Sequence, residues 1–318
     1  MIEFFKTTQG VTTEVSEPVA GCWINVVSPT DDDKRWLRDD LGISPDLLSS
    51  ALDDDERSHT DYDDDTNQTL VIADCPFVED AKEAEDTSIT QYDTHPLSFV
   101  FLPEKDMLVT ISLRENRAII TYTRERLRKV NTHQHTRLFL LIMLYISHSY
   151  IFYLRNIERQ FNANEKVLRE TLRDEELIKM LGFEKSLVYF STSLKSTEST
   201  LVRVSSGRVV KLYEDDRDLI DDVLIEIRQA IETCSIHTRV LNGIMDTFGS
   251  VISNNVNETM RRLTIITLIF AIPTIVFSFY GMNVSWLPGE FSWIIPTIVA
   301  IVGCFAGWGF LSKSRMFK

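Results

Sequence analysis

Small and polar side chains recur at alternating steps of four and three residues between residues 246 and 278. Steps that average 3.5 residues keep one face of a helix turned toward the axis of an oligomer. Hydroxyl, amide and carboxylate oxygens on such a face could line a polar pore. This polar face consists of Asp246, Ser250, Ser253, Asn257, Met260, Thr264, Thr267, Ala271, Thr274 and Ser278.

The same pattern has a second interpretation, in which small residues only allow helices to pack closely inside a membrane. The pore interpretation is favoured because Asn257 and Asp246 continue the row before the apolar segment begins. Apolar residues fall elsewhere on the circumference, where lipid or a second helix can cover them. They are Ile265, Ile269, Ile272, Val276 and Phe279.

Two apolar segments, Leu263–Tyr280 and Phe291–Leu311, are each close to the roughly 20 residues that cross a bilayer as a helix. Pro273 and Pro296 interrupt them, but neighbouring helices and Ser or Thr side chains can satisfy the freed carbonyl groups. Basic residues precede the first segment and follow the second, which predicts two spans with both termini in the cytoplasm. These bases are Arg261, Arg262, Lys313, Arg315 and Lys318.

A third apolar run, residues 138–154, is predicted to be a buried helix of the soluble part. Ser147, His148 and Ser149 lie at its centre, and it continues without a break into a charged helical pattern.

The rest of the chain predicts a mixed sheet with flanking helices, followed by long helices from residue 124 onward. A turn is expected at Gly207, and a helix without proline runs from about residue 213 toward Pro273. At 1.5 Å per residue it would span about 100 Å and must project into the bilayer. The β-rich runs are residues 2–5, 22–27, 69–75, 97–102, 107–112 and 118–122.

The 318 residues include 47 acids and 33 bases, and only one acid, Glu290, follows residue 262. An acidic domain repels nucleic acid and attracts cations, so nucleic acid is excluded as a partner. Four widely spaced cysteines favour a reducing, cytosolic setting. No nucleophile–base set, phosphate-binding glycine loop or zinc-enzyme motif is present in the sequence, which argues against an enzyme.

Acidic residues are densest between residues 53 and 65, where His59 also lies. Such a run is typical of a solvated loop, with a weak site for a hydrated cation as the alternative. His133 and His135 are expected to be exposed on a connector rather than to bind metal. The acids are Asp53, Asp54, Asp55, Glu56, Asp61, Asp63, Asp64 and Asp65.

Directly after the first apolar segment come Tyr280, Gly281, Met282 and Asn283, followed by a short loop, a final apolar segment and a basic end. In this position the motif resembles the signature of the CorA family of divalent-cation transport proteins. The resemblance implies a homopentameric funnel in the inner or plasma membrane, with stalk helices lining an axial pore for Mg²⁺ uptake. Co²⁺ or Ni²⁺ permeation would be consistent with it.

The motif also has a chemical rationale. Mg²⁺ gives up its water reluctantly, so a selective mouth should recognise the hydrated ion. A ring of Asn283 amide oxygens can accept hydrogen bonds from the bound water, and Gly281 permits a sharp turn after the helix.

The family resemblance implies regulation as well. Asp222, with Glu79 or Asp80, should meet across a subunit interface, where Mg²⁺ would relieve the repulsion between carboxylates and stabilise the closed state. Ala271 replaces the bulky apolar residue common in relatives, which moves the expected constriction to Leu263 and Met260.

The sequence therefore predicts an α+β cytosolic domain joined by a very long stalk helix to a two-helix transmembrane region. Alternatives are Zn²⁺ transport or Mg²⁺ efflux by the same architecture, or a membrane-anchored metal sensor that conducts nothing. Met282, where the zinc branch usually has isoleucine, favours Mg²⁺. The predicted segments are residues 1–262 with a stalk at about 213–262, spans at 263–280 and 291–311, an outer loop at 281–290 and a tail at 312–318.

Overall fold

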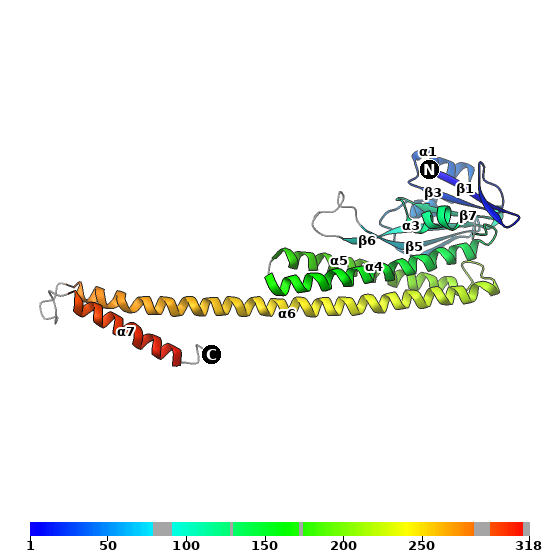
Figure 1. Ribbon diagram of the computed structural model, residues 1–318. Coiled ribbons are helices and arrows are strands. Elements are labelled where there is room, and N and C mark those ends of the chain that lie inside the picture. Colours follow the sequence, from blue (N-terminus) through cyan, green and yellow to red (C-terminus); the bar gives the residue numbers. More distant parts are fainter. Residues whose placement is uncertain (79–90, 128–129, 172–173, 283–292, 314–318) are drawn as a thin grey trace. The chain divides into compact units, whose positions relative to one another are not determined.

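The computed structural model describes residues 1–78, 91–127, 130–171, 174–282 and 293–313 (Figure 1). The chain divides into an N-terminal unit, Met1–Ile244, and a C-terminal unit, Met245–Lys318. Helix α6 (Glu214–Tyr280) contributes to both units. The predicted mixed α+β domain and long helix are thereby confirmed.

A seven-stranded sheet in the order β2-β1-β3-β7-β6-β5-β4 forms the centre of the N-terminal unit. β3 and β7 pair in parallel and the other neighbours are antiparallel, so the sheet is mixed. The strands are β1 (Ile2–Thr8), β2 (Val11–Val15), β3 (Cys22–Val27), β4 (Thr60–Asp63), β5 (Gln68–Val78), β6 (Tyr92–Leu102) and β7 (Met107–Ser112).

Helices cover both faces of this sheet (Figure 1). On one face, strand residues such as Ile24 and Val100 share a buried cluster with Leu47, from α2. On the other face, the rings of Phe99 and Phe101 lie 4.9 and 5.8 Å from that of Phe139, on α4. The helices of the first face are α1 (Asp31–Arg35) and α2 (Pro45–Ala51), and those of the second include α4 (His135–Thr171) and α5 (Asp174–Ser205).

The strand predicted at residues 118–122 is wrong. This segment forms α3 (Arg117–Ile120) and a π-helical turn, Thr121–Glu125. The side chain of Asn116 accepts a hydrogen bond of 2.8 Å from the backbone N–H of Ala118, and this cap favours a helix over an extended strand. The short strands β2 and β4 were not predicted either.

The apolar run at residues 138–154 lies in α4 and is buried within the N-terminal unit, as predicted. By length and composition α4 could cross a membrane. However, 56% of its most apolar 18-residue stretch is buried inside the structure, compared with 6% of the corresponding stretch of α6. The phenol of Tyr150 also donates a hydrogen bond to the carbonyl of Asp74 at 3.0 Å, which ties α4 to the sheet.

The first part of α6 packs within the N-terminal unit through buried residues at alternating steps of three and four. They are Ile220, Val223, Ile227, Ala230, Cys234, His237 and Leu241. Such spacing forms a seam between long helices. The predicted turn at Gly207 is confirmed, because α5 ends at Ser205 and Gly207 has a φ of 70°.

Candidate functional site

The polar face lies on α6, and every one of its side chains is exposed, as is Leu263. The hydroxyl of Thr264 donates to the carbonyl of Met260 at 2.8 Å, and Thr267 and Thr274 make the same bond four residues back. These hydroxyl groups therefore donate their hydrogen bonds to the backbone of their own helix. Their oxygen lone pairs remain free to accept hydrogen bonds from outside.

Helix α7 (Ile294–Lys313) packs against the opposite side of α6 within the C-terminal unit. Ile265 is buried, while Ile269, Ile272 and Val276 are partly buried. Residues two apart in a helix lie about 200° apart, so Thr274 points away from both Ile272 and Val276. The second helix thus leaves the polar face uncovered. Phe279, which was expected where lipid or a second helix could cover it, is 47% exposed in this unit.

Two glycines allow α7 to approach α6 closely. A Cβ atom on Gly303 would lie 2.8 Å from Cγ2 of Ile272, and one on Gly307 would lie 2.7 Å from its Cδ1. Glycines four residues apart are a common contact between helices in lipid. The sequence reasoning missed this contact, although the spacing of the two glycines could have indicated it.

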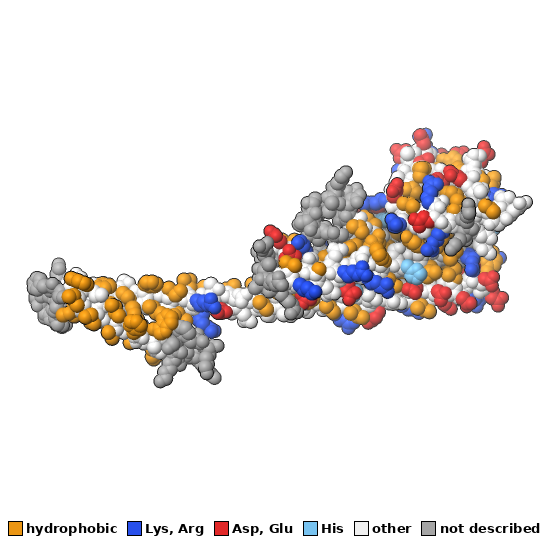
Figure 2. Space-filling model, in the orientation of Figure 1, with side chains coloured by type: hydrophobic (Ala, Val, Ile, Leu, Met, Phe, Trp, Pro, Cys, Tyr) orange, Lys and Arg blue, Asp and Glu red, His pale blue; other side chains and the backbone are white. Residues whose placement is uncertain are grey.

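Large apolar side chains cover much of the remaining surface of the C-terminal unit, where hydrophobic atoms gather along both helices in Figure 2. On α6 they include Phe270, Ile275 and Phe277, and on α7 they include Phe305 and Phe310, all at least half exposed. A soluble surface rarely carries so large an apolar area, whereas lipid covers it at no cost. Arg262, just before the first predicted span, pairs with Glu258.

The signature motif begins at the last residue of α6, Tyr280. The N–H of Gly281 donates to the carbonyl of Phe277 at 2.9 Å, and Met282 is exposed. Asn283 lies outside the described residues.

Of the predicted regulatory residues, Asp222 lies exposed on α6. Glu79 and Asp80 fall outside the described residues. The predicted meeting of these three carboxylates across a subunit interface therefore stays a prediction.

In the acidic run, single carboxylates bind nearby groups. Asp63 accepts the N–H of Asp65 at 2.9 Å, and Asp54 pairs with Arg114 at 3.2 Å. Hydrogen bonds, led by that from Ser44, lower the pKa of Asp63. Within the described part of the chain, no three His, Cys, Asp or Glu side chains are arranged to hold a metal ion.

The prediction for the two histidines is half wrong. His133 is exposed, but His135 begins α4 and is partly buried, with Nδ1 3.8 Å from Oδ1 of Asp106. Burial lowers its pKa, more than Asp106 raises it. The carboxylate comes from the turn before β7, far away in the sequence, so sequence spacing could not reveal it.

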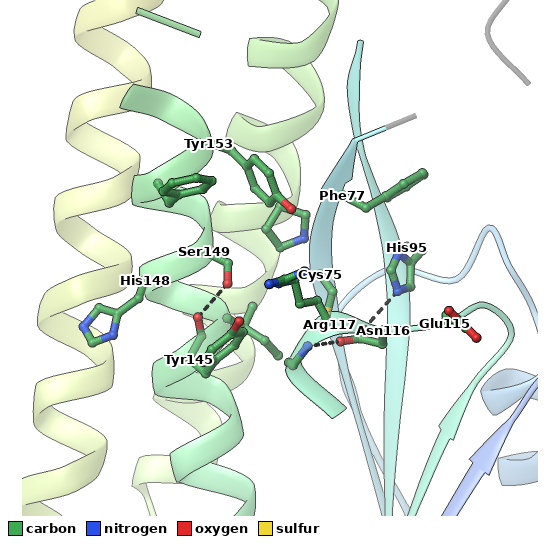
Figure 3. A pocket seen from close by; sticks show the side chains of 14 residues that line it. Cys75, Phe77, His95, Glu115, Asn116, Arg117, Tyr145, His148, Ser149 and Tyr153 are labelled. Atoms are coloured by element: carbon green, nitrogen blue, oxygen red, sulfur yellow. Dashed lines mark hydrogen bonds between the residues drawn. The ribbon is translucent and has the colours of Figure 1, made fainter. Parts of the chain in front are cut away.

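A hollow of about 380 Å³ lies in the N-terminal unit between α4 and the ends of β5 and β6 (Figure 3). There Nε2 of His95 accepts a hydrogen bond of 3.0 Å from the amide of Asn116. Burial lowers the pKa of His95 to about 4 and raises that of Cys75 to about 12. At neutral pH the two residues are an uncharged imidazole and an uncharged thiol, which is the wrong state for a reactive thiolate–imidazolium pair.

Comparison with known proteins agrees with this architecture. The profile of the family described as CorA-like Mg²⁺ transporter protein matches residues 20–312. The chain is 28% identical over 293 residues to the cobalt/magnesium transport protein CorA of Methanocaldococcus jannaschii, covering 88% of this chain and 86% of that protein. A CorA protein of the same name from Thermotoga maritima is 28% identical over 166 residues, covering 49% of this chain and 45% of the relative.

The fold is shared with the complete CorA magnesium transporter of Methanocaldococcus jannaschii. That structure has a TM-score of 0.79 and 24% identity, over 99% of this chain and 98% of the other. Since the family profile spans nearly the whole chain and the fold agrees over the same length, this protein belongs to the CorA-like family of Mg²⁺ transporters.

Proposed function

We propose that the chain forms a homopentameric channel of the inner or plasma membrane that takes up Mg²⁺ passively, with both termini in the cytoplasm. One observation carries the proposal: α7 covers one side of α6 and leaves the polar face exposed on the opposite side. Around a symmetry axis, five copies of this face would surround a pore lined by hydroxyl and amide groups. The exposed apolar side chains of α6 and α7 would then face neighbouring subunits and lipid.

The chemistry of the polar face suits a hydrated cation. Because Thr264, Thr267 and Thr274 donate their protons to α6 itself, their oxygens act as acceptors toward the pore. Water bound to Mg²⁺ presents hydrogens outward, so the ion can pass without losing its hydration shell. At the mouth, a ring of Asn283 amide oxygens would recognise the same shell. Ala271 is too small to narrow the pore, so Met260 and Leu263 would form the constriction instead.

No energy source beyond the membrane potential is required. Moving a divalent cation through 100 mV releases about 4.6 kcal/mol, which supports roughly a two-thousandfold accumulation. The excess of acids over bases in residues 1–262 would raise the local concentration of cations on the cytoplasmic side.

We further propose that Mg²⁺ closes the channel from the cytoplasmic side. Asp222 is exposed and its carboxylate is available to a neighbouring subunit. Facing Glu79 or Asp80 of that subunit, it would be repelled unless a cation bridged the two carboxylates. Bound Mg²⁺ would therefore favour the closed state, and loss of Mg²⁺ would open the channel.

The test is ion flux into proteoliposomes that contain the purified full-length chain and a Mg²⁺-sensitive dye. We expect Mg²⁺ to enter, faster when the inside is made negative with potassium and valinomycin. Parallel assays with Co²⁺, Ni²⁺ and Zn²⁺ measure ion preference. Preferential Zn²⁺ entry would favour the zinc transporter, and the absence of any flux would favour a membrane-anchored sensor.

A further inference from the structure

We infer that Cys304 is a positioning residue for transport, whose thiol replaces a backbone hydrogen bond that Pro273 removes from the pore helix. The inference rests on the proposed function, because it assumes that α6 lines the pore. Its starting point is a backbone hydrogen bond that is missing from α6. Proline has no N–H, so the carbonyl of Ile269, four residues before Pro273, loses its usual partner. In lipid an unsatisfied carbonyl is costly, because no water replaces the lost donor.

The neighbouring helix supplies a donor at this point. Sγ of Cys304, on α7, lies 3.7 Å from the carbonyl oxygen of Ile269, and the thiol donates toward it. Hydroxyl groups on α6 do not fill this role. Thr267 donates to the carbonyl of Leu263 and Thr274 to that of Phe270, each at 2.9 Å.

Close packing explains how so short a side chain reaches the backbone of α6. Gly303 precedes Cys304, and a Cβ atom on it would lie 2.8 Å from Ile272. A Cβ atom on Gly307, one turn later, would lie 2.7 Å from the same side chain. Side chains at these two positions would push α7 outward and carry the thiol out of reach of Ile269.

The contact acts on the polar face through the turn of α6 around Pro273. Ala271 and Thr274 belong to this turn and point away from α7, whereas Ile269 and Ile272 point toward it. Holding the carbonyl of Ile269 in place therefore fixes the direction of Ala271 and Thr274. Without the thiol the turn would sample several positions, and the conducting arrangement of the pore would be less populated.

A double-mutant cycle tests this role in the full-length chain, reconstituted into proteoliposomes. Cys304→Ala removes the donor and should lower Mg²⁺ flux about threefold, the size expected for one interhelical hydrogen bond in a membrane. Pro273→Ala restores an N–H to the carbonyl of Ile269, so Cys304→Ala should have no further effect in that background. Cys304→Ser, which keeps a donor, should retain the flux of the parent. Equal fold-changes in both backgrounds, or no change in either, would overturn the inference.

An infrared measurement reports on the contact without requiring transport. The difference spectrum between the parent and Cys304→Ala isolates one S–H stretching band, which should lie at the lower frequency of a hydrogen-bonded thiol. A band at the frequency of a free thiol would contradict the inference even if the chain conducts Mg²⁺. Conversely, a shifted band in a chain that conducts nothing would confirm the contact and refute the pore, so the two failures are distinguishable.

Discussion

Ile272 fills the space next to two glycines of α7: its Cγ2 lies 2.8 Å from the place that a Cβ atom on Gly303 would take, and its Cδ1 lies 2.7 Å from the corresponding place on Gly307. Each added methyl group would therefore collide with a different atom of one side chain. The contact fixes the distance between the two helices of the C-terminal unit, and with it the side of α6 that remains exposed.

The two collisions can be separated. Gly303→Ala and Gly307→Ala should each destabilise the protein by about 1–3 kcal/mol, as overpacking does. Ile272→Val removes Cδ1 and keeps Cγ2, so it should rescue Gly307→Ala but not Gly303→Ala. Thermal unfolding in detergent measures the effect, with Gly309→Ala as control, because a Cβ atom there meets nothing within 4 Å. Equal rescue of both variants would contradict this packing.

Cysteines along α6 test which side faces the axis. Asn257→Cys and Asp246→Cys should crosslink between subunits, because residues on the polar face approach their symmetry copies. Thr247→Cys and Glu258→Cys, each one residue away on the same helix, should crosslink much less. The readout is the yield of dimer on a denaturing gel after mild oxidation. Similar yields at all four positions would contradict the interpretation that the spacing turns the polar face toward the axis.

Asp222 tests regulation. Mg²⁺ should protect the parent from proteolysis, since a ligand that prefers one state shifts the population toward it. Asp222→Asn removes a negative charge from the proposed bridge and should shift the Mg²⁺ midpoint upward or reduce the protection. Titrations of protease protection and of flux are compared with those of the parent. Unchanged midpoints and amplitudes would assign Asp222 to solvated surface and turn attention to the acids at residues 53–65.

His95 makes a prediction about pH. Burial lowers its pKa from 6.5 to about 4, so between these values the unfolded chain binds a proton that the folded chain does not. The free energy of unfolding should therefore fall as the pH falls from 6.5 to 4, by up to about 1.4 kcal/mol per pH unit. His95→Gln keeps an acceptor for Asn116 and should make this dependence shallower. Urea unfolding at several pH values measures it, and parallel curves for parent and variant would contradict the buried, neutral state.

Features that repeat along the chain could be predicted from the sequence. Helix α6 and its polar face follow from spacing alone, because each turn presents the same side. The mixed sheet follows from short runs of β-branched and aromatic residues. The segment at residues 118–122 has the same composition, yet the cap from Asn116 makes it a helix. The cap and the burial of Ala118 and Ile119 are both consistent with a helix in this short run.

Contacts between distant segments could not be predicted in the same way. The approach of Cys304 to Ile269 depends on how α7 lies against α6, and no spacing within one helix encodes it. From the sequence we expected that neighbouring helices or Ser and Thr side chains could satisfy the carbonyl groups freed by Pro273 and Pro296, without identifying a residue that would do so. The approach of His135 to Asp106 is another example, since the two residues come from different segments of the N-terminal unit.

The most direct test of the central claim is the flux of Mg²⁺ through Asn283→Ala in proteoliposomes, at an imposed potential that is negative inside. If hydrated Mg²⁺ passes a ring of these amides, the variant should assemble like the parent by size-exclusion chromatography and lose selective Mg²⁺ uptake. The amide would contact water of the ion and no protein core, so stability should change little. A variant that assembles normally and still takes up Mg²⁺ at the rate and with the selectivity of the parent would contradict the account.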